Sequence, residues 1–462
     1  MQRALEIAEQ VRSGTRTARD IVEAALTRIG DTDAAYNCFT TVTFDRARRE
    51  AESVDAARRA GRPLGPLAGV PFAVKNLFDV EGLPTVAGTR TRSLSAPAEA
   101  DAALVSRLTA AGAVLVGTLN MDAYAYGFTT ENTAYGVTRN PHDRNRIAGG
   151  SSGGSAAALA AGMVPLSLGS DTNGSIRVPA SLCGVFGIKP TFGRLTRTGS
   201  YPFVANLDHL GPFATTTADL ATAYDAMQGP DPADPACSRR APEPTTSQLS
   251  RGLGELRVAR LVGYFDQWAS DPARAASIKA AEGLGAVAEI ELPEVERARA
   301  AAFIITATEG GTLRLPELRS RYADIEPHSR DRLAAGAITP GAWYVQAQKL
   351  RAWYLQKVLE IFSRYDVLIA PATPVPATEI GQDWLQLNSQ RIPLRPNLGL
   401  FTQPISCIGL PVVAAPIEGV SPLPIGVQII AAPWREDLCL RAAAHLERQG
   451  IARARIVEEP SA

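Results

Sequence analysis

Two glycine- and serine-rich turns stand close together in this chain and constrain its structure more than any other feature. They occupy residues 149–155 (GGSSGGS) and 169–175 (GSDTNGS). Glycine at this density lets the backbone take positive φ values and approach another group closely, so that backbone N–H groups point at a ligand. Serine beside such donors is how a chain builds a hydroxyl nucleophile next to an oxyanion hole. We therefore expect residues 148–200 to organise a site.

The composition indicates a globular protein with a sizeable core. The chain has 462 residues, 45% of them hydrophobic, with 47 basic and 47 acidic side chains. This balance gives no support for binding to nucleic acid or to an anionic membrane. The apolar run at residues 156–168 is too short to span a bilayer, and the N-terminus lacks a secretory signal pattern. We expect a cytoplasmic location.

The cysteines and histidines point away from disulfide and metal chemistry. The five cysteines are scattered without CxxC spacing, and none of the four histidines stands in HExxH or HxH spacing. We expect reduced thiols, no metal site and no cofactor. A serine nucleophile in this chain would then need a base other than histidine.

Lysine is scarce here, which makes Lys75 informative. The lysines are Lys75, Lys189, Lys279, Lys349 and Lys357, among 47 basic residues. Lys75 ends the apolar run of residues 67–75, which is typical of a buried strand. Unlike arginine, lysine can lose its proton near neutral pH once burial lowers its pKa from about 10.4. Lys75 is the candidate base, at a strand end where α/β sheets place their sites.

A serine-lysine site follows from these residues: Lys75, Ser151, Ser152 and Ser175, with the backbone of residues 172–175. Ser175 stands where the second turn enters a helix, so the helix N-terminus and nearby N–H groups can stabilise an oxyanion. A serine between the lysine and the nucleophile could relay the proton.

Plainer interpretations stay open at this point. Glycine-serine turns are most often ordinary loops, and a lone lysine is more often part of a salt bridge. Asp171 and Arg177 could simply pair to hold the second turn. Phosphate binding is the weakest alternative, because no GxxxxGK[ST] motif follows a strand.

The rest of the chain alternates helical and extended patterns. An N-terminal helical arm is expected over residues 1–60, and a core with the two turns over residues 67–227. Residues 229–253 indicate a surface linker, and residues 254–462 a second α/β part. We expect a single large α/β/α layered domain over residues 1–462, whose late strands complete the early sheet. Those late strands are expected at residues 366–371, 410–416 and 424–431.

Long segments of the chain resemble the amidase signature family. The resemblance is carried by residues 149–155, by residues 169–194 (GSDTNGSIRVPASLCGVFGIKPTFGR), and by Val74 with Lys75. It extends through residues 130–132 (TEN), 139–141 (RNP) and 424–428 (PIGVQ). A match of this length covers nearly the whole chain and is specific to the family.

The resemblance implies the amidase signature fold, a twisted mixed β-sheet covered by helices, and a Ser-cisSer-Lys triad. By position, Ser175 is the acylated nucleophile, Ser151 the serine after a cis peptide that passes the proton, and Lys75 the base. It also implies an oxyanion hole at Thr172, Asn173, Gly174 and Ser175, supporting roles for Ser152 and Arg177, and pocket roles for Tyr126 and Gly127. Many members have glycine in place of Asn173 and an acidic residue in place of Asn76, so the details of the donors and of the lysine environment are expected to differ.

A narrower resemblance implies the substrate and the partner. Residues 200–204, 208–212, 226–231 and 402–406 are similar to the 1-carboxybiuret hydrolase branch of the family, from cyanuric acid degradation. That branch implies hydrolytic release of ammonia from a small, anionic, urea-like amide. It also implies a small accessory subunit, similar to the C subunit of the tRNA-dependent amidotransferase, in a heterotetramer.

Two other functions compete with this one. The chain could be an amidotransferase A-type subunit, which hydrolyses glutamine and passes on the ammonia. It could instead be a non-catalytic scaffold paralogue, although the intact Lys75, Ser151 and Ser175 count against that.

Overall fold

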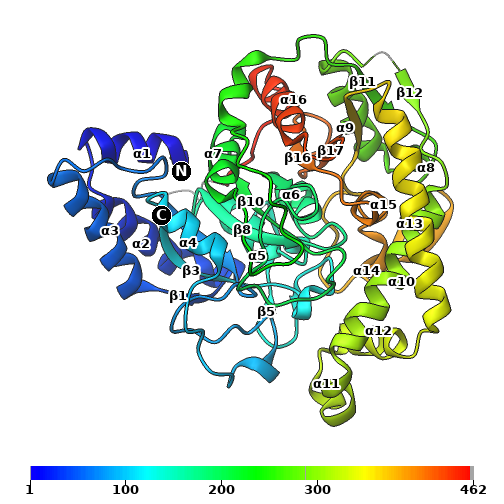
Figure 1. The fold of residues 1–462 in the computed structure, drawn as a ribbon, viewed down its shortest axis with the longest axis horizontal. Coiled ribbons are helices and arrows are strands. Elements are labelled where there is room, and N and C mark those ends of the chain that lie inside the picture. The colour runs from blue at the N-terminus through cyan, green and yellow to red at the C-terminus, as the bar shows by residue number, and fades with distance from the viewer. Residues whose placement is uncertain (1, 287, 458–462) are drawn as a thin grey trace.

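An 11-stranded mixed sheet forms the centre of the molecule (Figure 1). The computed structural model describes residues 2–286 and 288–457. In sheet order the strands are β1 (Phe39–Val42), β3 (Val114–Leu119), β2 (Pro71–Lys75), β8 (Leu166–Asp171), β10 (His209–Ala214), β9 (Phe186–Lys189), β16 (Val412–Pro416), β17 (Gly426–Ala431), β13 (Val367–Pro371), β11 (Val258–Leu261) and β12 (Ala288–Ile290). The early and late strands meet where β9 pairs with β16. The expected α/β class is confirmed, and we propose that the chain folds as one domain.

Helices flank this sheet, and in the described part of the chain three short hairpins form separate two-stranded sheets. The helices are α1 (Ala4–Ser13), α2 (Ala18–Tyr36), α3 (Phe44–Arg59), α4 (Ala103–Ala110), α5 (Gly153–Ala160), α6 (Arg177–Cys183), α7 (Thr217–Met227), α8 (Tyr264–Gln267), α9 (Asp271–Gly283), α10 (Val295–Leu313), α11 (Leu315–Ser320), α12 (Pro327–Ala337), α13 (Gly341–Phe362), α14 (Leu394–Asn397), α15 (Gln403–Cys407) and α16 (Glu436–Arg448). The hairpins pair β4 (Glu131–Asn132) with β5 (Gly136–Val137), β6 (Arg139–Asn140) with β7 (Asp143–Ile147), and β14 (Trp384–Leu387) with β15 (Gln390–Pro393). No helix within the described residues combines the length and apolarity needed to cross a bilayer.

Local sequence explains why these elements form. Every residue of β2, β8 and β17 is buried, as expected for strands that are covered on both faces. Helices α2 and α7 each begin after a threonine, Thr17 and Thr216, whose side chain accepts a backbone N–H of the first turn. This capping satisfies a donor that the helix itself cannot pair.

The register of the sheet brings the two predicted site regions together. β2 runs parallel to β8, with Val74 opposite Leu168. Both strands therefore end at the same edge of the sheet, where Lys75 closes β2 and Asp171 closes β8. This is the edge at which open α/β sheets bind ligands.

Two strands differ from the expectations. β1 lies within the expected helical arm, yet it pairs with β3 and forms one end of the main sheet. β10 lies in the middle of the sheet and gives no strand pattern, because its sequence HLGPFA contains glycine and proline. On this strand, β9 pairs with Phe213 and Ala214, so Pro212 lies beyond that part of the ladder.

The helices α10, α12 and α13 pack together at one side of the molecule. Figure 1 shows this group on the side away from the N-terminal helices α1, α2 and α3. α10 also contacts α15, which precedes β16. α10 also reaches the turn that follows β8, where Thr306 accepts a hydrogen bond from Asn173.

Candidate active site

Lys75 is fully buried and its amine lies among serine hydroxyls. Its Nζ donates to Ser151 Oγ at 2.6 Å and to Ser170 Oγ at 2.8 Å. Burial lowers the pKa of Lys75 to about 7, against the opposing pull of the Asp122, Asp171 and Asp208 carboxylates. An amine that loses its proton near neutral pH and contacts a hydroxyl can act as a general base.

The first turn holds Ser151 in place from both sides. The Gly150–Ser151 peptide bond is cis, and the carbonyl oxygen of Ser151 accepts the N–H of Asp122 at 3.1 Å. Next to it, Ser152 Oγ donates to the carbonyl of Ser170 and accepts the N–H of the same residue. Gly150 is required here, because a Cβ at this position would lie 2.0 Å from Asp122 Oδ2. Ser152 thus links the two turns.

Asp171 and Arg177 pair to hold the second turn, as the sequence suggested. Both side chains are fully buried, and Arg177 Nε and Nη2 each donate to the carboxylate at 2.9 Å. Burial opposes ionisation of Asp171, but Arg177, Lys189 and His209 keep its pKa well below the ordinary value. Arg177 Nη1 reaches Thr402 O and Gln428 Oε1, so the pair ties the turn to the C-terminal part of the chain.

The backbone of the second turn presents donors beside Ser175. Gly174 N–H is already used, because it donates to Asp171 Oδ1 at 2.7 Å. Among the described residues, no acceptor is bonded to the N–H groups of Thr172, Asn173 and Ser175. Three free donors next to a serine hydroxyl can stabilise a developing oxyanion. Gly174 has φ 140°, and a Cβ there would lie 2.2 Å from Thr402 Oγ1.

A narrow cavity opens onto Ser175. Its volume is about 20 Å³, and its lining includes Tyr126, Gly127, Thr172, Asn173, Ser175 and Arg332. Of the expected site residues, Tyr126, Gly127, Thr172, Asn173 and Ser175 therefore line the same cavity. Lys75 and Ser151 are buried and are not among the residues that line this cavity.

Tyr126 is both a cavity residue and a packed one. Its ring is 4.8 Å from the Phe203 ring, centroid to centroid, and the guanidinium carbon of Arg332 lies 3.9 Å from its centroid. Gly127 follows it because a Cβ there would lie 2.4 Å from the Asp122 carboxylate. That carboxylate accepts the N–H groups of Thr129 and Thr130 through Oδ2.

Arg332 is a cation that pairs with no carboxylate in the described part of the chain. Its hydrogen bonds there go to carbonyl oxygens only, those of Tyr126 and His328. Burial lowers the pKa of Arg332, which shows that its charge is poorly solvated. A cation kept in this way at the wall of a cavity favours an anionic ligand.

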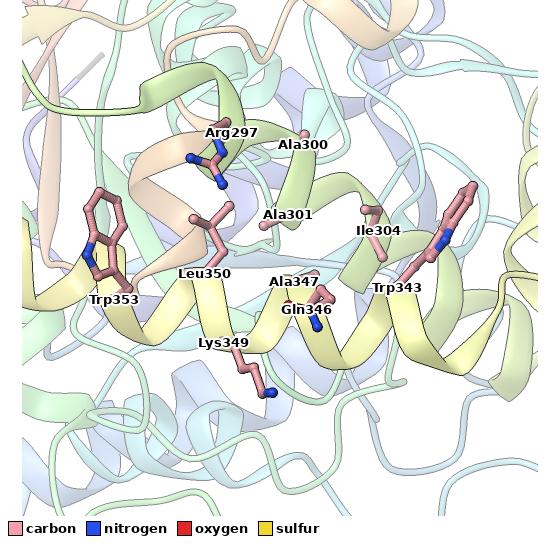
Figure 2. A pocket seen from close by; sticks show the side chains of 10 residues that line it. All are labelled: Arg297, Ala300, Ala301, Ile304, Trp343, Gln346, Ala347, Lys349, Leu350 and Trp353. Atoms are coloured by element: carbon pink, nitrogen blue, oxygen red, sulfur yellow. The ribbon is translucent and has the colours of Figure 1, made fainter.

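A larger groove lies elsewhere and carries no comparable chemistry. Its volume is about 570 Å³ and it lies between α10 and α13, with Trp353 and Leu350 at one end and Trp343 and Ile304 at the other (Figure 2). None of the described residues that line it is a serine, cysteine, histidine or carboxylate.

Within residues 2–286 and 288–457, no group of three or more His, Cys, Asp or Glu side chains could hold a metal ion.

Some site residues were missed by the sequence reasoning. Ser170 directly precedes Asp171 in the second turn, so its place at a strand end could have identified it as a lysine partner. Thr306 and Arg332 gave no such signal, because they come from helices more than 100 residues away from Ser175 in the chain.

The comparisons with known proteins agree with this geometry. The family model described as Amidase matches residues 20–440. The AtzE subunit of 1-carboxybiuret hydrolase from Pseudomonas sp. (strain ADP) is 58% identical over 456 residues, covering 98% of this chain and 99% of that protein. The A-type subunit of the glutamyl-tRNA(Gln) amidotransferase from Chloroflexus aurantiacus (strain ATCC 29366 / DSM 635 / J-10-fl) is 37% identical over 464 residues, covering 94% of each.

Solved structures are similar along the whole chain. One, described as a vestigial protein complex that reveals the evolutionary origins of an s-triazine catabolic enzyme, has a TM-score of 0.97 at 57% identity and covers 98% of this chain and 100% of its own. A bacterial aryl acylamidase has a TM-score of 0.89 at 28% identity, with 97% and 96% coverage. The chain is an amidohydrolase of the amidase signature family.

Proposed function

We propose that this enzyme hydrolyses a small urea-type amide, foremost 1-carboxybiuret, with release of ammonia. The observation that carries the proposal is the contact of a buried lysine of lowered pKa with Ser151, 2.6 Å away, beside a cavity that holds Ser175. A relative 58% identical to this chain is named as the AtzE subunit of 1-carboxybiuret hydrolase.

In the proposed mechanism, Ser175 Oγ attacks the carbonyl carbon of the substrate. Its proton passes through Ser151 to neutral Lys75, and the oxyanion is held by the free N–H groups of Thr172, Asn173 and Ser175. Lys75 then returns the proton through Ser151 to the leaving nitrogen, the C–N bond breaks, and ammonia departs. Water attacks the acyl-enzyme by the same relay and releases the acid.

In this proposal, Gly174, Ser152 and Arg177 support the structure of the site and do not contact the substrate. Gly174 N–H donates to Asp171, so we assign it to the shape of the turn rather than to the oxyanion. Ser152 bonds the backbone of Ser170, so we assign it to the alignment of the two turns. Arg177 bonds Asp171 and the backbone of Thr402, so we assign it to holding the turn in place.

The residues that line the cavity favour an anionic substrate. Arg332 lines the cavity without a carboxylate partner among the described residues, and Tyr126 and Gly127 lie beside it. We propose that the carboxylate of the substrate bonds Arg332, while Tyr126 packs against its planar body. This assigns Tyr126 and Gly127 to substrate binding.

We further propose that the enzyme works with a small accessory subunit similar to the C subunit of the tRNA-dependent amidotransferase, in a heterotetramer. Support comes from the similar structure described as a protein complex and from the similarity to a protein named as one subunit of an amidotransferase. All five cysteines are free, which suits the reducing cytoplasm that we propose as its location.

One assay separates this function from its competitor. Ammonia release is measured on 1-carboxybiuret, biuret, allophanate, glutamine and simple aliphatic amides, with and without a co-expressed small subunit. We expect 1-carboxybiuret to be the best substrate. The 37% identity to the A-type subunit of an amidotransferase favours glutamine as the alternative, and dominant glutaminase activity would replace our proposal with it.

A further inference from the structure

Asn173 lies in the second turn with its backbone carbonyl and half of its side chain already engaged. Its Nδ2 donates to Thr306 Oγ1 on α10 at 2.7 Å. Its carbonyl oxygen accepts the hydroxyl of Thr402 at 2.6 Å. The residue is 8% exposed, so these contacts hold it within the wall of the cavity. Its side chain therefore has one defined direction relative to Ser175.

The other half of that side chain finds no partner among the described residues. Asn173 Oδ1 is buried and accepts no hydrogen bond from any of them. Buried amide oxygens are nearly always bonded in folded proteins, because leaving one unpaired is costly. This oxygen belongs to a residue that lines the cavity opening onto Ser175. A ligand N–H placed in the cavity would supply the missing donor.

The position of the base decides which N–H this is. The nitrogen that leaves must take its proton from the Ser151 and Lys75 relay, which lies buried outside the cavity lining. In the proposed mechanism, the leaving nitrogen is directed toward this relay, and the acyl side of the substrate is left for the cavity that Asn173 lines. The group bonded to the scissile carbonyl on that side is then the candidate donor to Asn173 Oδ1.

We propose that Asn173 determines specificity by accepting a hydrogen bond from the N–H on the acyl side of the scissile carbonyl, so that the cavity selects ureas over carboxamides. In a urea-type substrate a nitrogen stands at that position, whereas a carboxamide has carbon there. The side-chain oxygen of Asn173 then accepts the N–H of one CO–NH unit, and the backbone N–H groups of the same turn bind its carbonyl oxygen. The inference rests on the proposed urea-type substrate and names the residue that recognises it.

The test uses two neutral probes of nearly the same shape, biuret and malonamide, in which the central NH of biuret is replaced by CH2. The kcat/KM for ammonia release is measured on both probes for the wild type, Asn173→Ala and Asn173→Asp. Asp keeps an acceptor oxygen at the same place, whereas Ala removes it. The intrinsic reactivity of each probe cancels when the variants are compared with the wild type.

We expect Asn173→Ala to reduce the preference for biuret over malonamide by roughly 10- to 100-fold, and Asn173→Asp to retain most of it. A structural role would lower both probes by the same factor, and that result would overturn the inference. Asn173→Gly removes the same oxygen and replaces the Ala variant if the latter does not fold. 1-Carboxybiuret is assayed in parallel, and a wild type that releases ammonia from none of the three compounds would instead refute the proposed function.

Discussion

Asp171 and Arg177 form a bidentate ion pair that is completely enclosed by protein, with both donor distances at 2.9 Å. The pair stands between the strand that ends at Asp171 and the helix that begins at Arg177. The carboxylate also accepts the N–H of Gly174 and of Ile176. One side chain thus sets the path of the turn that carries Ser175.

Replacing that carboxylate is expected to destabilise the whole fold. Asp171→Asn leaves Arg177 as a buried cation without its counter-charge, which costs about 3–5 kcal/mol. Because the pKa of Asp171 is held below its ordinary value, its contribution is complete above the unfolded pKa and declines only as the pH falls through the folded one. The loss measured by urea unfolding should therefore be the same at pH 6 and pH 8. Glu360→Gln, in the exposed pair with Lys357, is the matched control and should cost less than about 1 kcal/mol. Equal midpoints for the two variants would contradict this prediction.

The pH dependence of kcat should report the buried lysine. Lys75 accepts a proton only when neutral, and burial lowers its pKa to about 7. Activity is then expected to fall tenfold per pH unit below about pH 7 and to level off above it. Lys75→Ala should lower kcat by roughly 10²- to 10⁴-fold and abolish this limb. Lys357→Ala, at the surface, should leave the profile unchanged. A profile that is flat down to pH 5 would argue against Lys75 as the base.

Labelling with a fluorophosphonate should distinguish the proposed roles of Ser175, Ser151 and Ser152. Ser175→Ala is expected to lose the label altogether, because Ser175 is the proposed nucleophile. Ser151→Ala should label roughly 10²- to 10⁴-fold more slowly, since it breaks the relay to Lys75. Ser152→Ala should still label, because its hydroxyl bonds only the backbone of Ser170. Ser320→Ala is the surface control, and mass spectrometry identifies the modified residue. Label found on any residue other than Ser175 would refute its assignment.

Arg332 should matter for charged substrates and not for neutral ones. Arg332→Met is expected to lower kcat/KM on allophanate by roughly 10- to 100-fold, because a charged hydrogen bond is lost. Biuret, which lacks the carboxylate, should be affected far less. Arg319→Met on the neighbouring helix α11 controls for a general change of charge. Equal losses on both substrates would show that Arg332 acts through Tyr126 instead.

Local sequence patterns indicate the candidate reactive residues better than they indicate the residues that line the cavity. Lys75, Ser151 and Ser175 stand out as candidates because local patterns mark them, namely an apolar strand ending in lysine and serines in glycine-rich turns; their catalytic roles stay predictions. The pairing of Asp171 with Arg177 was also foreseeable, since the two residues flank one turn. All of these signals lie within short segments.

The parts that escaped prediction depend on distant contacts. β10 is a strand because β8 and β9 supply its partners, not because its own residues favour one. Thr306 reaches Asn173 across 133 positions of sequence, and only the packing of α10 beside the turn brings them together. No local pattern contains that information.

The candidate reactive residues and two of the cavity-lining residues come from different parts of the fold. Lys75 ends β2, the turn that carries Ser175 follows β8, and Ser151 precedes α5, whereas Thr306 and Arg332 belong to the peripheral helices α10 and α12. Substitutions in those helices can therefore alter which molecule is accepted while the reactive machinery stays intact. In evolutionary terms, new substrates are within reach of a few changes in the helical wall, which suits a scaffold shared by relatives that act on such different compounds.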